Sequence, residues 1–203
     1  MIVEDLPDKV TAQTHTCAVD TETTGLDPRQ GAFPTLFQYH SDRFGTYTIQ
    51  LDKGKSVPYN VIVLLASKYI TKIMHHAPFD MMMLRYNYQV LCHNVKCTKI
   101  AAKILDPARK EGSQSLGPLL ERKLGIKIEK NAEVRLSGFQ GELSQAQIDY
   151  AEQDVQYLVP LYMAMYLEMD ESQREKYRVA CEYLPLITEI NCAPVDLTGM
   201  YSY

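Results

Sequence analysis

The chain has 203 residues, of which 46% are hydrophobic and 23% are charged, and its net charge is −4; this is the composition of an ordinary soluble globular protein, long enough to bury a core without disulfides. Five irregularly spaced cysteines favour a reducing compartment such as the cytoplasm and argue against a secreted disulfide framework. Residues 1–5 do not resemble a signal peptide and the longest aliphatic run, residues 61–66, is too short to cross a bilayer, so we expect an intracellular protein with no membrane partner.

Sequence periodicity predicts strands and helices that alternate along the chain. In chain order, we predict strands at residues 14–20, 37–40 and 46–51, a helix at 57–69, a strand at 70–76, a helix at 79–86, a strand at 90–97, and helices at 115–124, 144–169 and 171–190. Ser144 and Gln147 form a capping-box pattern at the start of the longest helix. Early strands followed by alternating strands and helices indicate an α/β fold, with a mixed five-stranded sheet flanked by helices.

Asp20 and Glu22 stand at the end of the first predicted strand. Side chains two residues apart on a strand point to the same face, so these two carboxylates should lie side by side. Adjacent carboxylates repel each other, and a cation between them removes that repulsion. Hard oxygen ligands suit Mg²⁺ or Mn²⁺ better than Zn²⁺. The alternative is an ordinary surface turn, because Asp, Thr and Gly are common in turns.

Residues 75–80 lead from an apolar strand into a helix and end with Asp80. An acid in the first turn of a helix can be a metal ligand, or it can simply interact favourably with the helix dipole. His75 and His76 are adjacent, and neighbours on a strand point to opposite faces. This pair therefore does not predict a zinc site.

Tyr150 and Asp154 are four residues apart on the longest predicted helix and share one face. The same face continues through Leu158 and Leu161, which should point toward the body of the protein. A carboxylate on such a face needs a partner, and a metal ion provides one. The alternative is a Tyr and an Asp at the edge of the core.

The three acidic motifs, in this order, resemble those of the DEDDy-type 3′→5′ exonucleases. Residues 19–26 are similar to the first motif, residues 76–80 to the second and residues 150–155 to the third, and residues 137–144 resemble the segment that precedes the third. The resemblance covers about residues 12–170. The similar proteins include the proofreading domain of family-A DNA polymerases and ribonuclease D. Two positions depart from it, because His76 stands where many members have Asn and Cys97 where many have Asp.

This resemblance implies a ribonuclease H-like fold for an exonuclease domain at residues 1–170. It implies that Asp20, Glu22, Asp80 and Asp154 hold two Mg²⁺ or Mn²⁺ ions, which promote hydrolysis of the 3′-terminal phosphodiester and release of a nucleoside monophosphate. Tyr150 is the expected residue that orients the attacking water, because a phenol is poorly suited to act as a general base.

The resemblance also implies contacts with the terminal nucleotides. Thr23 and Leu26 follow the first motif, and His76 and Phe79 lie in the second. An aromatic side chain such as Phe79 can stack on the bases of a single strand. The alternative for Leu26 is that it packs beneath the turn, and the alternative for Phe79 is burial in the core.

The motifs leave the substrate open. The first interpretation is a proofreading enzyme that acts on single-stranded DNA 3′ ends, with a polymerase domain as its partner. The second is trimming of RNA 3′ ends, as in ribonuclease D. A third, of another class, is a non-catalytic binding domain that keeps the fold, but such domains usually lose acids and this chain has all four.

Residues 171–203 are predicted to form a C-terminal helical extension. Residues 182–196 loosely resemble the junction between the exonuclease and polymerase domains of family-A polymerases. The alternative is a terminal helix that covers the exonuclease domain.

Overall fold

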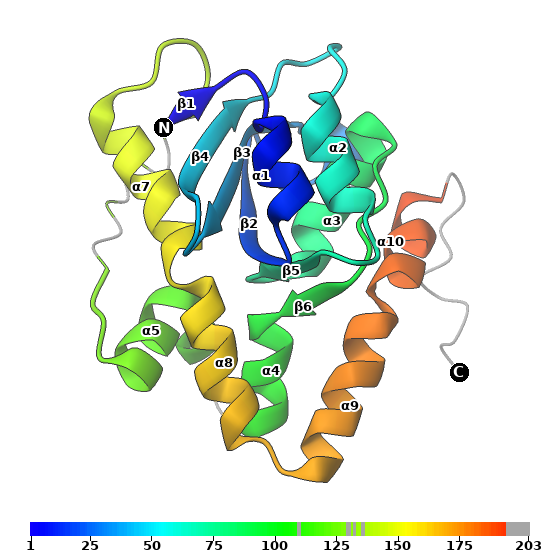
Figure 1. The fold of residues 1–203 in the computed structure, drawn as a ribbon, viewed down its shortest axis with the longest axis vertical. Coiled ribbons are helices and arrows are strands. Elements are labelled where there is room, and N and C mark those ends of the chain that lie inside the picture. The colour runs from blue at the N-terminus through cyan, green and yellow to red at the C-terminus, as the bar shows by residue number, and fades with distance from the viewer. Residues whose placement is uncertain (109–110, 129–130, 132, 135–136, 194–203) are drawn as a thin grey trace.

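The computed structural model describes residues 1–193 with the exception of 109–110, 129–130, 132 and 135–136. A six-stranded mixed sheet runs through the middle of the fold (Figure 1), in the order β1-β4-β3-β2-β5-β6. β3 runs antiparallel to β2 and β4, and the pairs β1–β4, β2–β5 and β5–β6 are parallel. The strands are β1 (Ile2–Val3), β2 (Thr16–Thr23), β3 (Pro34–Ser41), β4 (Gly45–Gln50), β5 (Thr71–Met74) and β6 (Val95–Cys97).

The structure confirms the predicted α/β fold with helices on both sides of a mixed sheet (Figure 1). The predicted five strands omit β1, because two residues are too few to show a period-2 pattern. None of the helices in the described part of the chain is long and apolar enough to cross a membrane. The helices are α1 (Asp8–Gln13), α2 (Tyr59–Ala66), α3 (Ala77–Tyr88), α4 (Thr98–Leu105), α5 (Leu116–Leu124), α7 (Gln145–Gln156), α8 (Leu158–Glu168), α9 (Glu171–Glu182) and α10 (Leu184–Cys192), with short 3-10 turns η1 (Pro28–Gln30) and η2 (Glu111–Gln114).

Two of the predicted helices are each divided into two. Residues 144–169 form α7 and α8, because Pro160 lacks a backbone N–H and its ring clashes with the carbonyl of Gln156, four residues earlier, where α7 ends. Pro185 stands in the same relation to Cys181, and residues 171–190 accordingly form α9 and α10.

The two faces of the sheet differ in polarity. Val19 and Thr21 of β2 are buried on the same face as Phe37 and Tyr39 of β3, and this face packs into the main core. The alternate residues of β2 point to the opposite face, on which α7 packs across β2, β3 and β4. β2 continues past its predicted end to Thr23, because it pairs with β3 as far as Pro34 across a bulge.

The C-terminal helices pack against the rest of the fold. α9 contacts α4 and β6, and α10 contacts α3. Tyr177, Cys181 and Leu184 are buried there, and Arg85 on α3 forms an ion pair of 2.7 Å with Glu189. Residues 194–203, which include the end of the segment that resembles a polymerase junction, lie outside the described residues. The division of the chain at residue 170 stays a prediction.

Candidate active site

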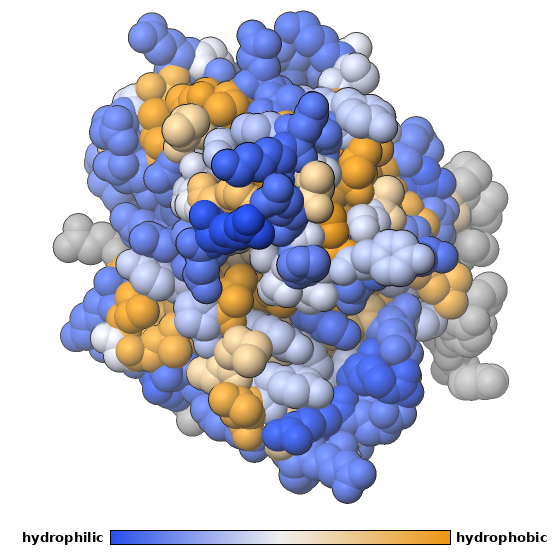
Figure 2. Space-filling view, viewed as in Figure 1, coloured by the Kyte–Doolittle hydropathy of each residue, from blue (hydrophilic) through white to orange (hydrophobic). Residues whose placement is uncertain are grey.

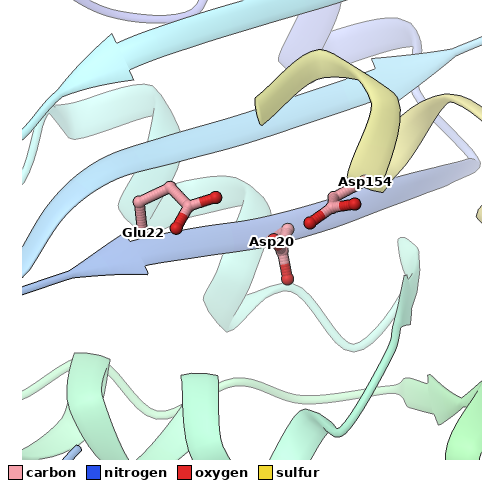
Figure 3. Close-up of side chains that lie close together, drawn as sticks. All are labelled: Asp20, Glu22 and Asp154. Carbon is pink, nitrogen blue, oxygen red and sulfur yellow. The ribbon is translucent and has the colours of Figure 1, made fainter. Parts of the chain in front are cut away.

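Three carboxylates meet where α7 crosses β2 (Figure 3). Asp20 and Glu22 come from β2 and Asp154 from α7, and each offers an oxygen within 4.8 Å of the other two. The period-2 argument therefore places the first two correctly, although Asp20 lies inside the strand and not at its end. The predicted capping box at Ser144 fixes the start of α7, and Asp154 follows near the other end of that helix. Hard oxygen donors at this spacing fit Mg²⁺ or Mn²⁺.

Asp80 approaches these carboxylates from α3, on the opposite face of β2. It is only 3% exposed, and its Oδ1 accepts a hydrogen bond of 2.6 Å from the Thr21 hydroxyl. Burial, together with the negative charge of Asp154, raises the pKa of Asp80 to about 7. Asp80 borders the same cavity as Asp20 and Asp154, so all four predicted acids gather in one region around β2.

The cavity beside the acids has a volume of about 440 Å³. Leu26, His76 and Phe79, three of the four predicted substrate contacts, line it. Leu26 is 82% exposed, which excludes the alternative that it packs beneath the turn. The rings of His76 and Phe79 are nearly parallel, at 14°, with centroids 6.4 Å apart. His76 has a left-handed backbone conformation, with φ of 68°, just before α3.

Thr23 and Tyr150 lie next to this cavity and are not part of its described lining. The Thr23 hydroxyl donates to the Gly25 carbonyl at 2.8 Å, within the turn that carries Leu26. Tyr150 is buried against Phe139, with ring centroids 5.9 Å apart, and lines a second cavity of about 510 Å³. The two cavities share Ser115 and Leu116 and therefore adjoin.

Several residues around the acids were not predicted from the sequence. Lys99 brings a positive charge to the acidic cavity from the first turn of α4, a helix that the periodicity did not indicate. His75 also lines the cavity, and its Nδ1 lies 2.9 Å from the Thr98 hydroxyl. Thr21 lies between the two acids of the first motif. The period-2 pattern of a strand already indicates that its side chain points to the face opposite the acids. Ser115, at the start of α5, carried no signal of a role here.

Residues 3–170 match the family model described as 3′-5′ exonuclease. The chain belongs to the 3′-5′ exonuclease family. This exonuclease is 30% identical over 122 residues to ribonuclease D of Haemophilus influenzae, a match that covers 60% of this chain and 30% of that protein. The chain thus spans less than a third of the length of this curated relative.

Solved structures support the same assignment. Brucella melitensis NrnC has a TM-score of 0.85 and 28% identity, with 100% of this exonuclease and 94% of NrnC covered. NrnC structures with bound Mg²⁺ and bound to pGG match with TM-scores of 0.83 and 0.84. Escherichia coli RNase D has the same fold, with a TM-score of 0.72, 19% identity and coverage of 96% of this chain and 51% of that one.

The family resemblance, the ribonuclease H-like fold and the class of a metal-dependent 3′→5′ exonuclease are therefore confirmed. The carboxylate group fits the divalent cations that such a nuclease uses. The individual roles of the site residues stay predictions.

Proposed function

We propose that this chain removes nucleoside monophosphates one at a time from the 3′ end of single-stranded RNA by two-metal-ion catalysis. The observation that carries the proposal is the meeting of Asp20, Glu22 and Asp154, from a strand and a helix, next to buried Asp80. These four acids are the proposed ligands of two Mg²⁺ or Mn²⁺ ions. Such ions supply an activated water and stabilise the leaving 3′ oxygen.

Two further side chains are suited to act near the reacting phosphate. Tyr150 precedes Asp154 by one helical turn, and its hydroxyl is proposed to orient the attacking water by a hydrogen bond. Lys99 lines the same cavity as the acids and is suited to contact a phosphate oxygen of the substrate. A cation at this point offsets the repulsion between an acidic site and a polyanionic strand.

The mouth of the cavity fits the last bases of an unpaired strand. The nearly parallel rings of His76 and Phe79 offer a surface for base stacking. Exposed Leu26 is placed to insert beside a base, and Thr23 stabilises the turn that presents it. These contacts need bases that are not paired, so the proposed substrate is a single strand or a frayed end.

RNA is proposed in preference to DNA because of the relatives. The Haemophilus influenzae relative is named ribonuclease D, and NrnC was solved bound to pGG. The proofreading interpretation, with single-stranded DNA as substrate and a polymerase domain as partner, has no comparable support. It stays a prediction that the same assay tests.

The test uses RNA and DNA strands of one sequence, each labelled at the 5′ end and incubated with Mg²⁺. We expect a ladder that shortens by one nucleotide at a time from the 3′ end, faster for RNA, and no cleavage with chelator or with a blocked 3′ end. Asp154→Asn should abolish cleavage, whereas Asp149→Asn, on the same helix but exposed, is the matched control. Faster cleavage of DNA refutes the RNA proposal, and strand binding without any cleavage indicates the non-catalytic domain.

A further inference from the structure

The sheet face beneath α7 carries a row of polar residues that begins at Asp20. Asp20 on β2 pairs directly with Gln38 on β3, and Gln38 pairs directly with Thr48 on β4. Residues that pair directly on neighbouring strands point to the same face, with Cβ atoms about 4.5–5.5 Å apart. Because α7 packs on all three strands, Gln38 and Thr48 have no exposed surface. The row therefore leads from a proposed metal ligand into a covered part of the sheet.

Gln38 and Thr48 do not satisfy their own hydrogen-bonding groups. Among the described residues, Nε2 and Oε1 of Gln38 and Oγ1 of Thr48 are buried and have no hydrogen-bond partner. Burial of a polar group without a partner is unfavourable, and few buried groups in native proteins lack one. Leu36, two residues away on the same face, shows that an apolar side chain can occupy this layer. The carboxamide of Gln38 is thus poorly explained by packing alone.

We propose that Gln38 is a positioning residue for the metal ligand Asp20. In the metal-loaded protein, Gln38 Nε2 donates a hydrogen bond to the Asp20 carboxylate, and Gln38 Oε1 accepts one from the Thr48 hydroxyl. This arrangement gives a hydrogen-bond partner to Nε2 and Oε1 of Gln38 and to Oγ1 of Thr48. The inference rests on the proposed function, because it assigns Asp20 to a metal.

A neutral amide is well suited to this role. A carboxylate that ligates a cation through one oxygen keeps lone pairs that a donor can occupy, and such donors fix the orientation of the ligand. A Lys or Arg at the same place would compete with the cation for the carboxylate, whereas an amide leaves its negative charge intact. Gln38 is therefore predicted to raise metal affinity and to support catalysis, and not to stabilise the metal-free protein.

The test compares Gln38→Met, which keeps the length of the side chain without its polar atoms, with Thr11→Val as a matched control. Thr11 lies on α1 and also has a buried hydroxyl without a partner among the described residues. We would measure Mn²⁺ dissociation by electron paramagnetic resonance without substrate, the melting temperature in chelator, and kcat and KM. For Gln38→Met we expect Mn²⁺ affinity about 10-fold or more weaker. We also expect a lower kcat and an equal or higher melting temperature, because unsatisfied polar atoms are removed.

Thr11→Val should leave the Mn²⁺ affinity unchanged, and Gln38→Asn, which keeps the amide, should bind Mn²⁺ more tightly than Gln38→Met. Wild-type Mn²⁺ affinity in Gln38→Met overturns the inference, and so does a loss of affinity that merely follows a loss of melting temperature. In both cases the proposed function stands as long as the wild-type protein binds Mn²⁺ and cleaves RNA. A wild-type protein that binds no Mn²⁺ overturns the proposed function itself.

Discussion

Asp80→Asn should stabilise the metal-free protein while it removes cleavage. Burial raises the pKa of Asp80 from its ordinary value of 3.8 to about 7, so the folded protein retains a proton that the unfolded chain has already lost. The free energy of unfolding therefore falls as the pH rises from about 4 to 7. One pKa unit corresponds to about 1.4 kcal/mol, so the full effect above pH 7 is on the order of 4 kcal/mol. Asn has no such titration, and its side-chain oxygen can still accept from the Thr21 hydroxyl.

Urea unfolding in chelator at pH 5 and pH 8 measures this effect directly. The stability gained by Asp80→Asn should be larger at pH 8 than at pH 5. In a thermal unfolding experiment, each kcal/mol gained would raise the melting temperature by about 2–4 °C for a chain of this size. Asp149→Asn, at an exposed acid on α7, is the matched control. Added Mg²⁺ should raise the stability of the wild-type protein more than that of Asp80→Asn. A gain that is the same at pH 5 and pH 8 would show that burial of Asp80 does not carry the predicted free energy.

Three further predictions concern other parts of the chain. Tyr150→Phe should lower kcat less than Asp154→Ala, since an orienting hydroxyl contributes less than a metal ligand; equal losses in folded variants would contradict an orienting role. Burial lowers the pKa of Lys72 to about 8 against 10.5 when unfolded, so urea titrations should show wild-type stability rising relative to Lys72→Met between pH 8 and 10. If the stability of the wild-type protein did not change relative to that of Lys72→Met over this interval, the lowered pKa of Lys72 would be contradicted. Deletion from Ser172 onward should lower the melting temperature strongly, because it removes Tyr177, which is 1% exposed; an unchanged melting temperature and cleavage rate would favour a separable, junction-like extension.

The sequence could predict which of the candidate site residues share a face, because they follow the periodicity of the elements that carry them. Asp20 and Glu22 share a face because a strand repeats every two residues, and Tyr150 and Asp154 lie one helical turn apart. Neither rule needs any tertiary information. The resemblance to a family supplied the order of the motifs, and the match over residues 3–170 confirmed the family.

The features that were missed depend on contacts between distant segments or on short elements. The hydrogen bond between Thr21 and Asp80 joins residues 59 positions apart, and no local pattern indicates it. Gln38 is notable only because it pairs with Asp20, which requires knowledge of the strand register. The helix breaks at Pro160 and Pro185 have a local cause, because each proline removes a backbone N–H even though the apolar pattern continues through it.

The tripeptide Asp20-Thr21-Glu22 connects both faces of the sheet at the site. Its first and third residues point toward α7 and Asp154, while the middle residue points toward α3 and holds Asp80 through its hydroxyl. A shift of the β2 register by one residue would exchange these faces, so that the acids would enter the main core and Thr21 would lose Asp80. Pairing with β3, in which Asp20 lies opposite Gln38 and Thr21 opposite Phe37, opposes this shift because Phe37 must stay in the core. The geometry of the acids is thus maintained by the same burial of apolar side chains that stabilises the sheet.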